Sequence, residues 1–325
     1  MRKYNLPIFI PHRGCPHDCV FCSQRKITGI DTEVTPTQVR EMIVDFLKTV
    51  KKDDSTAEVA FFGGSFTGLE YATQEEFLKT AAEFFPQIDG IRLSTRPDYI
   101  DDNIINLIKK HGVTTVELGV QSSDELVLQM NSRGHNFESV RTASKLIKDA
   151  GITLGHQMML GMYGSTPEKD MQTVRDIISL KPACVRIYPV VTIKDTALED
   201  LYKAGKYQPY TVEQAAELAK QAVLEFRNAD IEVIRVGPHS SEELENDGNI
   251  VAGPYHPAFG ELVDSLIYRD LIEEEIKKSS PDGKNYEYIC APSEVSKVVG
   301  HKGINKKYFY DKYGICLKVR SRKDE

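Results

Sequence analysis

Three cysteines near the N-terminus have the residue type and the spacing to bind a metal cluster. Cys15, Cys19 and Cys22 follow the pattern C-x3-C-x2-C, so one short loop can direct three thiolates at one object. Thiolates select iron–sulfur clusters, zinc or Cu(I). No further Cys or paired His follows at zinc-finger spacing, and a disulfide across such short loops would be strained and leave one thiol over. Three ligands with an open fourth position therefore indicate a [4Fe–4S] cluster that leaves one iron free for a substrate or cofactor.

The elements around these cysteines alternate between short apolar segments and amphipathic ones. Buried parallel strands separated by helices form a βαβ series with right-handed crossovers. This α/β pattern predicts a partial or complete TIM-type (β/α) barrel, whose active site lies in the loops after the strands. The cysteines follow the first apolar segment and so occupy such a loop. The expected strands are 8–10, 57–62, 91–94, 115–120, 153–160, 185–191 and 232–236, and the expected helices are near 37–50, 74–85, 100–111, 136–150, 168–180 and 212–227.

Length and composition set the broad class of the protein. A chain of 325 residues with 41% hydrophobic and 27% charged residues is typical of a soluble globular protein, with either one large domain or one large domain plus a small appendage. There is no apolar run of membrane-spanning length and no signal-peptide core, so no membrane association is expected. Six cysteines in such a chain favour the reducing cytoplasm, and isolated Cys184, Cys290 and Cys316 are expected to be buried as small apolar residues.

With Phe21 placed as in C-x3-C-x-aromatic-C, the cysteine loop resembles the radical S-adenosylmethionine (SAM) superfamily. The resemblance implies that the amino and carboxylate groups of SAM chelate the open iron. It also implies that Phe21 covers the adenine and that Gly63 and Gly64, after the second strand, receive the SAM amino group. Ser65 stands where many members carry Glu. Packing beneath the loop is the alternative for Phe21, and a tight turn is the alternative for the glycines.

Further motifs narrow the resemblance to a subgroup. Over roughly residues 5–260 the chain looks like the radical SAM domain of the catalytic subunit of Elongator, a tRNA-modifying enzyme. It is more distantly similar to oxygen-independent coproporphyrinogen III oxidase. The motifs, in order, are Ser94-Thr95-Arg96-Pro97-Asp98-Tyr99, Glu117-Leu118-Gly119-Val120-Gln121-Ser122, Arg133-Gly134-His135, Gly164 to Asp170 and Arg186-Ile187-Tyr188-Pro189.

The same resemblance assigns polar residues to the SAM site. Gln121 and Arg133 match positions that line it, and Arg133 is expected to pair with the SAM carboxylate, with a solvated surface charge as the alternative. His156 and Gln157, on the fifth strand, are expected near the ribose or the substrate. A hydrogen-bonded core histidine is the alternative for His156. Tyr188 faces either the cavity or the core.

The resemblance also implies a reaction. An external one-electron donor of the flavodoxin or ferredoxin type reduces the cluster, and SAM is cleaved to methionine and a 5′-deoxyadenosyl radical that takes a hydrogen atom from the substrate. The protein then supplies orientation, electrostatics and the exclusion of water.

Residues 281–325 form a separate unit after the linker Ser279 to Gly283, so the expected domains are 1–280 and 281–325. The expected order is a strand at 286–290, a helix at 293–299, the turn Gly300-His301-Lys302-Gly303, a helix at 304–313 and a strand at 315–320. This βααβ order resembles the RNA-binding KH domain, whose GxxG loop clamps a nucleic-acid backbone; a plain helix–helix turn is the alternative.

Charge supports an RNA-binding role for this unit. It holds ten Lys and Arg against six Asp and Glu, whereas the whole chain has a net charge of −7. Lys306 and Lys307 join the loop as expected phosphate contacts.

We expect no room before Glu325 for an acetyltransferase domain like that of the Elongator subunit, so carboxymethylation from acetyl-CoA is not expected.

Two main functions follow. The favoured one is a radical SAM enzyme that modifies RNA, either tRNA or ribosomal RNA. The alternative is a radical SAM enzyme for a small metabolite or tetrapyrrole, with the C-terminal unit as a structural lid. A non-catalytic RNA-binding protein with a vestigial cluster is disfavoured by the intact cysteines and Gly63-Gly64. The substrate atom and the oligomeric state are not predicted.

Overall fold

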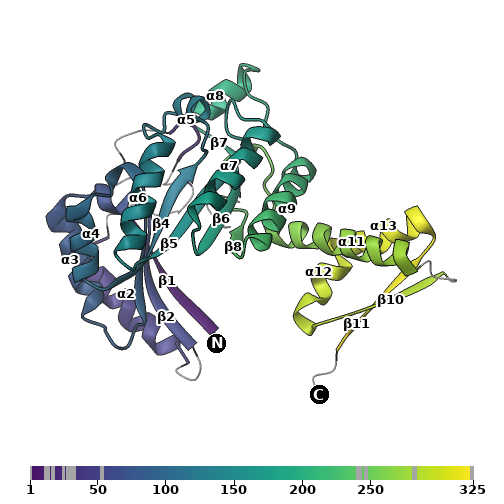
Figure 1. The fold of residues 1–325 in the computed structure, drawn as a ribbon, viewed down its shortest axis with the longest axis horizontal. Coiled ribbons are helices and arrows are strands. Elements are labelled where there is room, and N and C mark those ends of the chain that lie inside the picture. Colours follow the sequence, from purple (N-terminus) through teal and green to yellow (C-terminus); the bar gives the residue numbers. More distant parts are fainter. Residues whose placement is uncertain are drawn as a thin grey trace.

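A curled sheet of seven parallel strands forms the centre of the molecule, in a computed structural model that describes residues 2–10, 15, 19–23, 26, 34–51, 55–238, 244, 248–279 and 284–322. The strand order equals the chain order, β1-β2-β3-β4-β5-β6-β8 (Figure 1). The predicted TIM-type architecture is confirmed as a partial barrel. The strands are β1 (Arg2–Ile10), β2 (Ser55–Gly63), β3 (Gly90–Thr95), β4 (Val113–Gln121), β5 (Thr153–Leu160), β6 (Cys184–Pro189) and β8 (Glu232–Val236).

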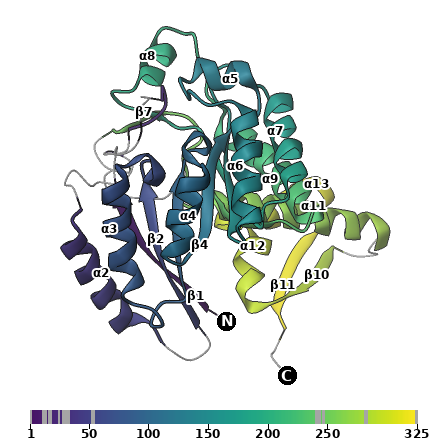
Figure 2. The ribbon, with the colours of Figure 1, turned by 60° about the vertical axis from the view of Figure 1, so that its left-hand side comes forward.

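Helices cover the outer face of this sheet, as Figure 2 shows for α3, α4, α6 and α7. Their boundaries follow from caps in the sequence: Thr35 and Gln38 form a capping box at the start of α2, and Thr211 and Gln214 do the same for α9. The main helices are α2 (Pro36–Thr49), α3 (Tyr71–Ala82), α4 (Asp102–Lys110), α6 (Phe137–Asp149), α7 (Pro167–Leu180) and α9 (Val212–Asn228).

Four short elements were not predicted because they are too short to show a periodic pattern. They are the helices α5 (Glu125–Met130) and α8 (Ala197–Lys203) and the antiparallel pair β7 (Thr192–Ile193) and β9 (Ile250–Ala252). The backbone of α8 and of the residue that follows α5 bonds to Val20 in the cysteine loop.

The two faces of the sheet differ in chemistry because successive side chains of a strand point to opposite sides. In β4, Val116, Leu118 and Val120 are fully buried against the helices. Glu117 and Gln121 alternate with them and face the inside of the half-barrel. The apolar core therefore lies between sheet and helices, and the inner face is polar.

The first and last strands approach each other without pairing. The Nζ of Lys3 on β1 lies 3.4 Å from a carboxylate oxygen of Glu232 on β8. Both side chains are largely exposed, so this ion pair contributes little stability. It shows how far the seven strands curl.

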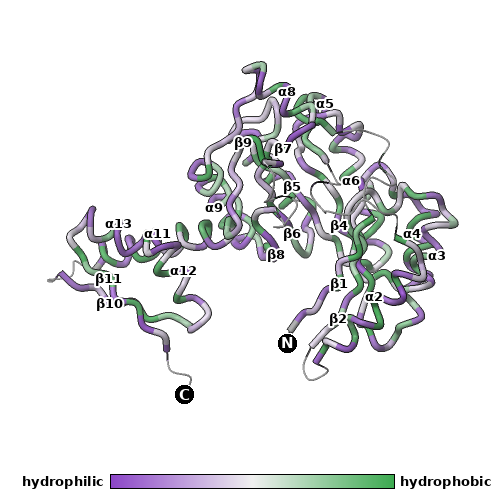
Figure 3. Tube along the Cα trace, turned by 180° about the vertical axis from the view of Figure 1, so that it is seen from behind, coloured by the Kyte–Doolittle hydropathy of each residue, from purple (hydrophilic) through white to green (hydrophobic). Residues whose placement is uncertain are grey.

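The C-terminal unit has the predicted βααβ order. It comprises β10 (Asn285–Cys290), α12 (Val295–Val299), α13 (Ile304–Tyr313) and β11 (Cys316–Ser321), and the two strands pair in parallel. The long helix α11 (Phe259–Ser279) packs against α9 and against α12. Figure 3 shows the C-terminal unit at the far end of α11 from the half-barrel. Ile272 and Ile276 of α11 belong to the core of this unit, so the helix before the expected linker is part of its packing.

None of the helices that the structure describes combines the length and the apolar character needed to cross a bilayer. All six cysteines are free thiols. Cys184 and Cys290 are buried as expected, but the prediction for Cys316 is wrong, because the outward face of β11 exposes it.

Candidate cofactor site

The described part of the cysteine loop is held by two neighbouring segments. The Val20 N–H donates to the Asn131 carbonyl over 3.3 Å, and the Val20 carbonyl accepts from the Leu198 N–H at 2.8 Å. Asn131 follows α5 and Leu198 lies in α8. These two short helices therefore position Cys19, which is buried, and Cys22, which is partly buried.

Arg133 lies directly beside the cysteines. Its Nη1 is 3.5 Å from the Sγ of Cys19, and its Nη2 donates to the Gly119 carbonyl over 2.8 Å. Only 8% of the residue is exposed, which excludes the surface-charge alternative. Its Nε is buried and has no hydrogen-bond partner among the described residues. A buried guanidinium with an unused donor and no carboxylate partner is suited to an anion.

The end of β4 is irregular at the position of Gln121. The pairing with β5 shifts register between Gly119 and Gln121, and Gln121 has a φ of 65°. Such bulges and left-handed residues often re-aim side chains at functional sites. Gln157 on β5 donates from Nε2 to Gln121 Oε1 over 3.3 Å. A Cβ on Gly119 would meet Gln121 Nε2 at 2.9 Å and Arg133 Nη2 at 3.3 Å, so the two predicted SAM-site residues converge over this glycine.

The glycines after β2 sit against β1. Gly63 has a φ of 107°, and an added Cβ would lie 2.9 Å from the Ile10 carbonyl oxygen. The Gly64 N–H donates to the same carbonyl over 2.9 Å. Only glycine fits at 63. The Gly64 N–H is thus already bonded within the fold. The contact of Gly63 and Gly64 with the SAM amino group stays a prediction, and their carbonyl oxygens would be the groups that make it.

Ser65 and Arg96 join the ends of β2 and β3. Ser65 is buried; its hydroxyl bonds to Thr95 Oγ1 at 2.8 Å and accepts from the Arg96 N–H at 3.2 Å. Arg96 donates twice to Asp98, at 2.9 and 2.7 Å, yet its Nη1 is buried without a partner in the described chain. Sequence reasoning gave Arg96 no role. Its place in the Ser94–Tyr99 motif was the only signal.

The positive charges of Arg133 and Arg96 affect the pKa of the Cys15 thiol. Loss of hydration and the neighbouring Cys19 raise the pKa of the Cys15 thiol, although part of the residue reaches solvent. Arg133 and Arg96 oppose that rise. Both guanidinium groups therefore lie close enough to stabilise negative charge at the cysteines.

Two buried histidines have different surroundings. Burial, aided by Arg133, lowers the pKa of His135 to about 3, and its Nε2 lies 3.2 Å from the Val120 carbonyl. His156 is fully buried on the outer face of β5, and its Nε2 is 2.9 Å from the hydroxyl of Ser144 on α6. The expectation that His156 lies near ribose or substrate is wrong, because the strand directs it into the helix layer.

Phe21 and Tyr188 also have definite places. Phe21 packs against the small apolar cluster that includes Val127, Met162 and Leu198. This is the packing alternative, and covering of adenine stays a prediction. Tyr188 pairs with Met159 in the β5–β6 register, so it shares the inner face with Arg186, two residues earlier.

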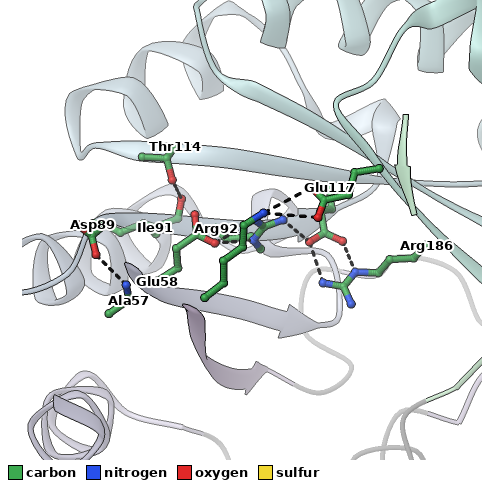
Figure 4. Close-up of polar contacts among 10 residues, drawn as sticks. Ala57, Glu58, Asp89, Ile91, Arg92, Thr114, Glu117 and Arg186 are labelled. Carbon is green, nitrogen blue, oxygen red and sulfur yellow. Dashed lines mark hydrogen bonds and ion pairs between the residues drawn. The ribbon is translucent and has the colours of Figure 1, made fainter. Parts of the chain in front are cut away.

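A chain of largely buried charges crosses the inner face of the sheet (Figure 4). Arg92 donates to Glu58 at 2.9 and 3.0 Å and to Glu117 at 2.8 Å. Arg186 donates to both carboxylate oxygens of Glu117 and lies over the Phe62 ring, 5.3 Å from its centroid. Burial opposes ionisation of Glu117, but Arg186 and Arg92 prevail, and its pKa is lowered. Sequence reasoning missed this network.

The residues near the cysteines fit an iron–sulfur cluster and SAM. Among the described residues, no three metal-ligating side chains are already gathered around one point; residues 11–14, 16–18 and 24–25, which flank the cysteines, lie outside that set. The chemistry of the donors agrees, because Arg133 contacts the Cys19 thiol, Arg133 and Arg96 both act on the Cys15 thiol, and each of the two buried guanidinium groups retains an N–H with no partner in the described chain. An anionic cluster and a carboxylate are the groups that such donors bind.

The expected RNA contacts gather at one end of the C-terminal unit. Gly300 has a φ of 76°, and a Cβ there would meet Ile304 Cγ2 at 2.7 Å; Gly303 has a φ of 75°. Lys302 between them is also left-handed, with a φ of 52°. The His301 ring packs edge-on against His256, with the centroids 5.0 Å apart. Lys306 and Lys307 follow in the first turn of α13 and are exposed.

Sequence comparisons show which family the chain matches and which proteins it resembles. Residues 9–177 match the Radical SAM superfamily and residues 182–269 match the Radical_SAM C-terminal domain. The chain is 29% identical over 253 residues to "tRNA uridine(34) acetyltransferase" of Methanocaldococcus jannaschii. This match covers 64% of the chain and 46% of that protein. It is 28% identical over 254 residues to "Elongator complex protein 3" of Saccharomyces cerevisiae, covering 64% and 45%. The chain thus spans about half the length of these relatives.

Solved structures show the same fold. The Elp3 of Methanocaldococcus infernus with an N-terminal deletion superposes with a TM-score of 0.63 at 24% identity, covering 97% of this chain and 68% of that one. Coproporphyrinogen III oxidase (HemN) of Escherichia coli gives a TM-score of 0.52 at 16% identity, covering 70% and 53%. Because more than half of its length, residues 9–177, matches the Radical SAM superfamily, the chain is an enzyme of that superfamily.

Proposed function

We propose that this enzyme uses SAM and a [4Fe–4S] cluster to modify RNA, with tRNA as the expected class. The observation that carries the proposal is the similarity of its radical SAM part to proteins named tRNA uridine(34) acetyltransferase. The subgroup motifs from Ser94 to Asp170 lie within residues 9–177, which match the Radical SAM superfamily, and Arg186 to Pro189 lie within residues 182–269, which match the Radical_SAM C-terminal domain.

At the cofactor site, bound SAM and the cluster would supply radical chemistry that abstracts a hydrogen atom from the substrate. Cys15, Cys19 and Cys22 would hold the cluster. Arg133 would hold the SAM carboxylate through the donor that the fold leaves unpaired. Gln121 and Gln157, joined by their hydrogen bond, would orient the remainder of SAM.

The C-terminal unit provides a surface for RNA. Lys302, Lys306 and Lys307 form no ion pair within the described chain, and Tyr310 is 65% exposed. Free cations attract phosphates, and an exposed aromatic ring offers a face for base stacking. A hollow of about 410 Å³ lies beside α13, lined by Lys306, Tyr310, Cys316, Leu317, Lys318, Val319 and Arg320. We assign the GxxG loop to the phosphate backbone and treat 281–325 as the RNA-binding unit.

The cluster would require an external one-electron donor, and a flavodoxin or ferredoxin is the expected kind. A small flavoprotein or iron–sulfur protein would need to approach the cysteine loop, since electrons must reach the cluster from outside. The cytoplasmic location inferred from cysteine usage would supply both this donor and RNA.

An RNA-binding measurement on the anaerobically reconstituted holoenzyme tests the proposal. We expect tRNA to bind with an affinity that falls steeply with salt, by roughly 0.7–0.9 log units per tenfold salt increase for each phosphate contact. A duplex DNA of equal length serves as control, because it carries phosphates without the RNA fold. Equal binding of DNA and tRNA, or no binding of either, would favour the small-molecule alternative.

A further inference from the structure

The inner face of the half-barrel carries an arginine, Arg235, that has no counter-charge among the residues the structure describes. Glu58, Arg92, Glu117 and Arg186 alternate in sign from β2 to β6 and satisfy one another. At the lower rim, Lys3 pairs with Glu232. Arg235 on β8 comes next in this series, and it forms no ion pair with any residue the structure describes.

The register places Arg235 directly beside Arg186. The two residues are partners in the parallel β6–β8 pairing, so both side chains leave the sheet on its inner face. Like charges opposite each other on neighbouring strands destabilise a sheet. Glu117 is shared between Arg186 and Arg92 and so cannot also neutralise Arg235.

The guanidinium of Arg235 is only partly satisfied by the backbone. Its Nε donates to the Gly237 carbonyl and its Nη2 to the Pro238 carbonyl, both over 3.2 Å. Carbonyl oxygens orient the group without neutralising it, and Nη1 has no hydrogen bond within the described chain. The side chain is half-buried, so its charge is less screened than on an open surface.

Tyr188 adds a hydroxyl to the same place. It lies on the inner face two residues after Arg186. Burial lowers the pKa of Arg186, but its bonds to Glu117 and the neighbouring Tyr188 raise it overall. Because the two residues are i and i+2 on β6, the Tyr188 and Arg186 side chains are neighbours on one face of the sheet. Two arginines and a phenol from adjacent strands form a donor set for an oxyanion.

This place is linked to the cofactor site by direct contacts. Arg186 pairs with Gln157 in the β5–β6 register, and Gln157 donates to Gln121. Over the adjacent Gly119, Arg133 reaches towards Cys19. A group bound at Arg186 and Arg235 would therefore lie two strands away from the cofactors, on the same face.

We propose that Arg235, Arg186 and Tyr188 form a binding site for an oxyanion of the substrate, a phosphodiester or a carboxylate, which completes the alternating charges of the inner face. The choice of source rests on the function proposed above: with RNA as substrate, the oxyanion is the phosphate next to the target nucleotide. The site would fix that nucleotide beside the cofactors, while the C-terminal unit holds the rest of the RNA.

Arg235→Gln is the variant that tests the site, because it removes the charge and retains a hydrogen-bond donor for the backbone carbonyls. Arg175→Gln, on the exposed side of α7 at 51% side-chain exposure, is the matched control. Arg235→Lys retains the charge, and Tyr188→Phe removes only a hydroxyl; both remain informative if the glutamine variant does not fold. Far-ultraviolet circular dichroism and the cluster absorbance of each reconstituted variant report on folding.

Three probes are titrated into the holoenzyme with SAM present: unmodified tRNA, inorganic phosphate and acetate. We expect Arg235→Gln to bind tRNA roughly ten- to a hundred-fold more weakly, as for loss of a charge-assisted contact. Its salt slope should fall by about 0.7–0.9, the value of one phosphate. Arg175→Gln should match the wild type, and Arg235→Lys should recover part of the affinity.

The probes separate the two sources of the oxyanion. Loss of phosphate or acetate binding in Arg235→Gln with unchanged tRNA affinity would support the site but assign it to a small anionic substrate. If the wild type binds no RNA, the proposed RNA function fails, and phosphate and acetate still decide whether the site exists. Wild-type affinity of Arg235→Gln and Tyr188→Phe for all three probes would overturn the assignment.

Discussion

The guanidinium of Arg133 lies 3.5 Å from the sulfur of Cys19, although 114 positions separate the two residues in sequence. The contact joins the loop after β1 to the segment between α5 and α6. A buried cation at this distance stabilises a thiolate and any anion bound beside it. The cofactor site is thus assembled from two parts of the chain, each with its own testable role.

The first prediction concerns the cluster ligands. Anaerobically reconstituted protein should hold about four irons per chain and release 5′-deoxyadenosine when given dithionite and SAM. Cys19→Ala should lose the brown cluster absorbance and the SAM cleavage, because a thiolate ligand is missing. Cys316→Ser, at an exposed cysteine in β11, should retain both. Full iron content and activity in Cys19→Ala would show that other residues hold the metal.

The second prediction concerns Arg133. Arg133→Ala should weaken SAM binding by roughly 1.5–3 kcal/mol, the value of a hydrogen bond to a charged group, as measured by titration of the reconstituted protein. Iron content should remain, since the cysteines are unchanged. Arg141→Ala, on the exposed side of α6, controls for loss of an arginine. Unchanged SAM affinity together with a lower melting temperature would make Arg133 a structural residue.

The third prediction concerns the GxxG loop. A double variant with Asp at His301 and Lys302 should bind RNA more weakly, with a lower salt slope, because the loop then repels phosphates. Asp tolerates the left-handed conformation of Lys302 better than most residues. Lys181→Asp is the matched control: Lys181 is exposed and has a φ of 51° at the end of α7. Equal RNA affinity in wild type and double variant would reduce the GxxG loop to a simple turn.

The fourth prediction concerns Asp170, which holds the loop after β5. Its carboxylate accepts from the Gly161 N–H at 2.8 Å and from the Ser165 hydroxyl at 2.5 Å. Burial nevertheless raises its pKa to about 6, from 3.8. The folded protein therefore binds this proton more tightly than the unfolded chain does. The resulting stabilisation is complete below about pH 3.8 and is lost as the pH rises through 6.

The free energy of unfolding that is lost when Asp170 ionises is roughly 3 kcal/mol, from about 1.4 kcal/mol for each pKa unit. Asp170→Asn cannot titrate, so its free energy of unfolding should lack this decline between pH 4.5 and 7. Urea unfolding of the metal-free chain at several pH values measures it. Asp45→Asn, at an exposed aspartate on α2, should decline as the wild type does. The same slope in Asp170→Asn would assign the titration to another group.

The fold was largely predictable because its main helices are long and periodic and its buried strands are apolar segments between turn residues. The bounds of β5 and β8 agree with the predicted ones, since each is a short apolar segment flanked by turn residues. The order of elements in the C-terminal unit was also predictable, because glycines and polar turns separate its strands and helices. Helix α5 and strand β7 were missed, since six and two residues are too few to show a period.

The site was less predictable, because the role of a strand residue there depends on which face of the sheet its side chain takes. His156 and Gln157 are adjacent, so they must face opposite sides of the sheet; the sequence does not state which of them faces inward. The bulge at Gln121 depends on pairing with β5, which is a tertiary property. The charges of Arg92, Glu117 and Arg186 interrupt apolar strands, and that interruption was the available signal for the inner-face network.

The most direct measurement of the central claim, a radical SAM enzyme that acts on RNA, is mass spectrometry of RNA nucleosides. Total tRNA and ribosomal RNA would be compared between a deletion strain and strains complemented with wild type or Cys19→Ala. We predict that one modified nucleoside is missing in the deletion strain, restored by the wild type and still missing with Cys19→Ala, which cannot hold the cluster. Identical nucleoside profiles in all strains would contradict the RNA function.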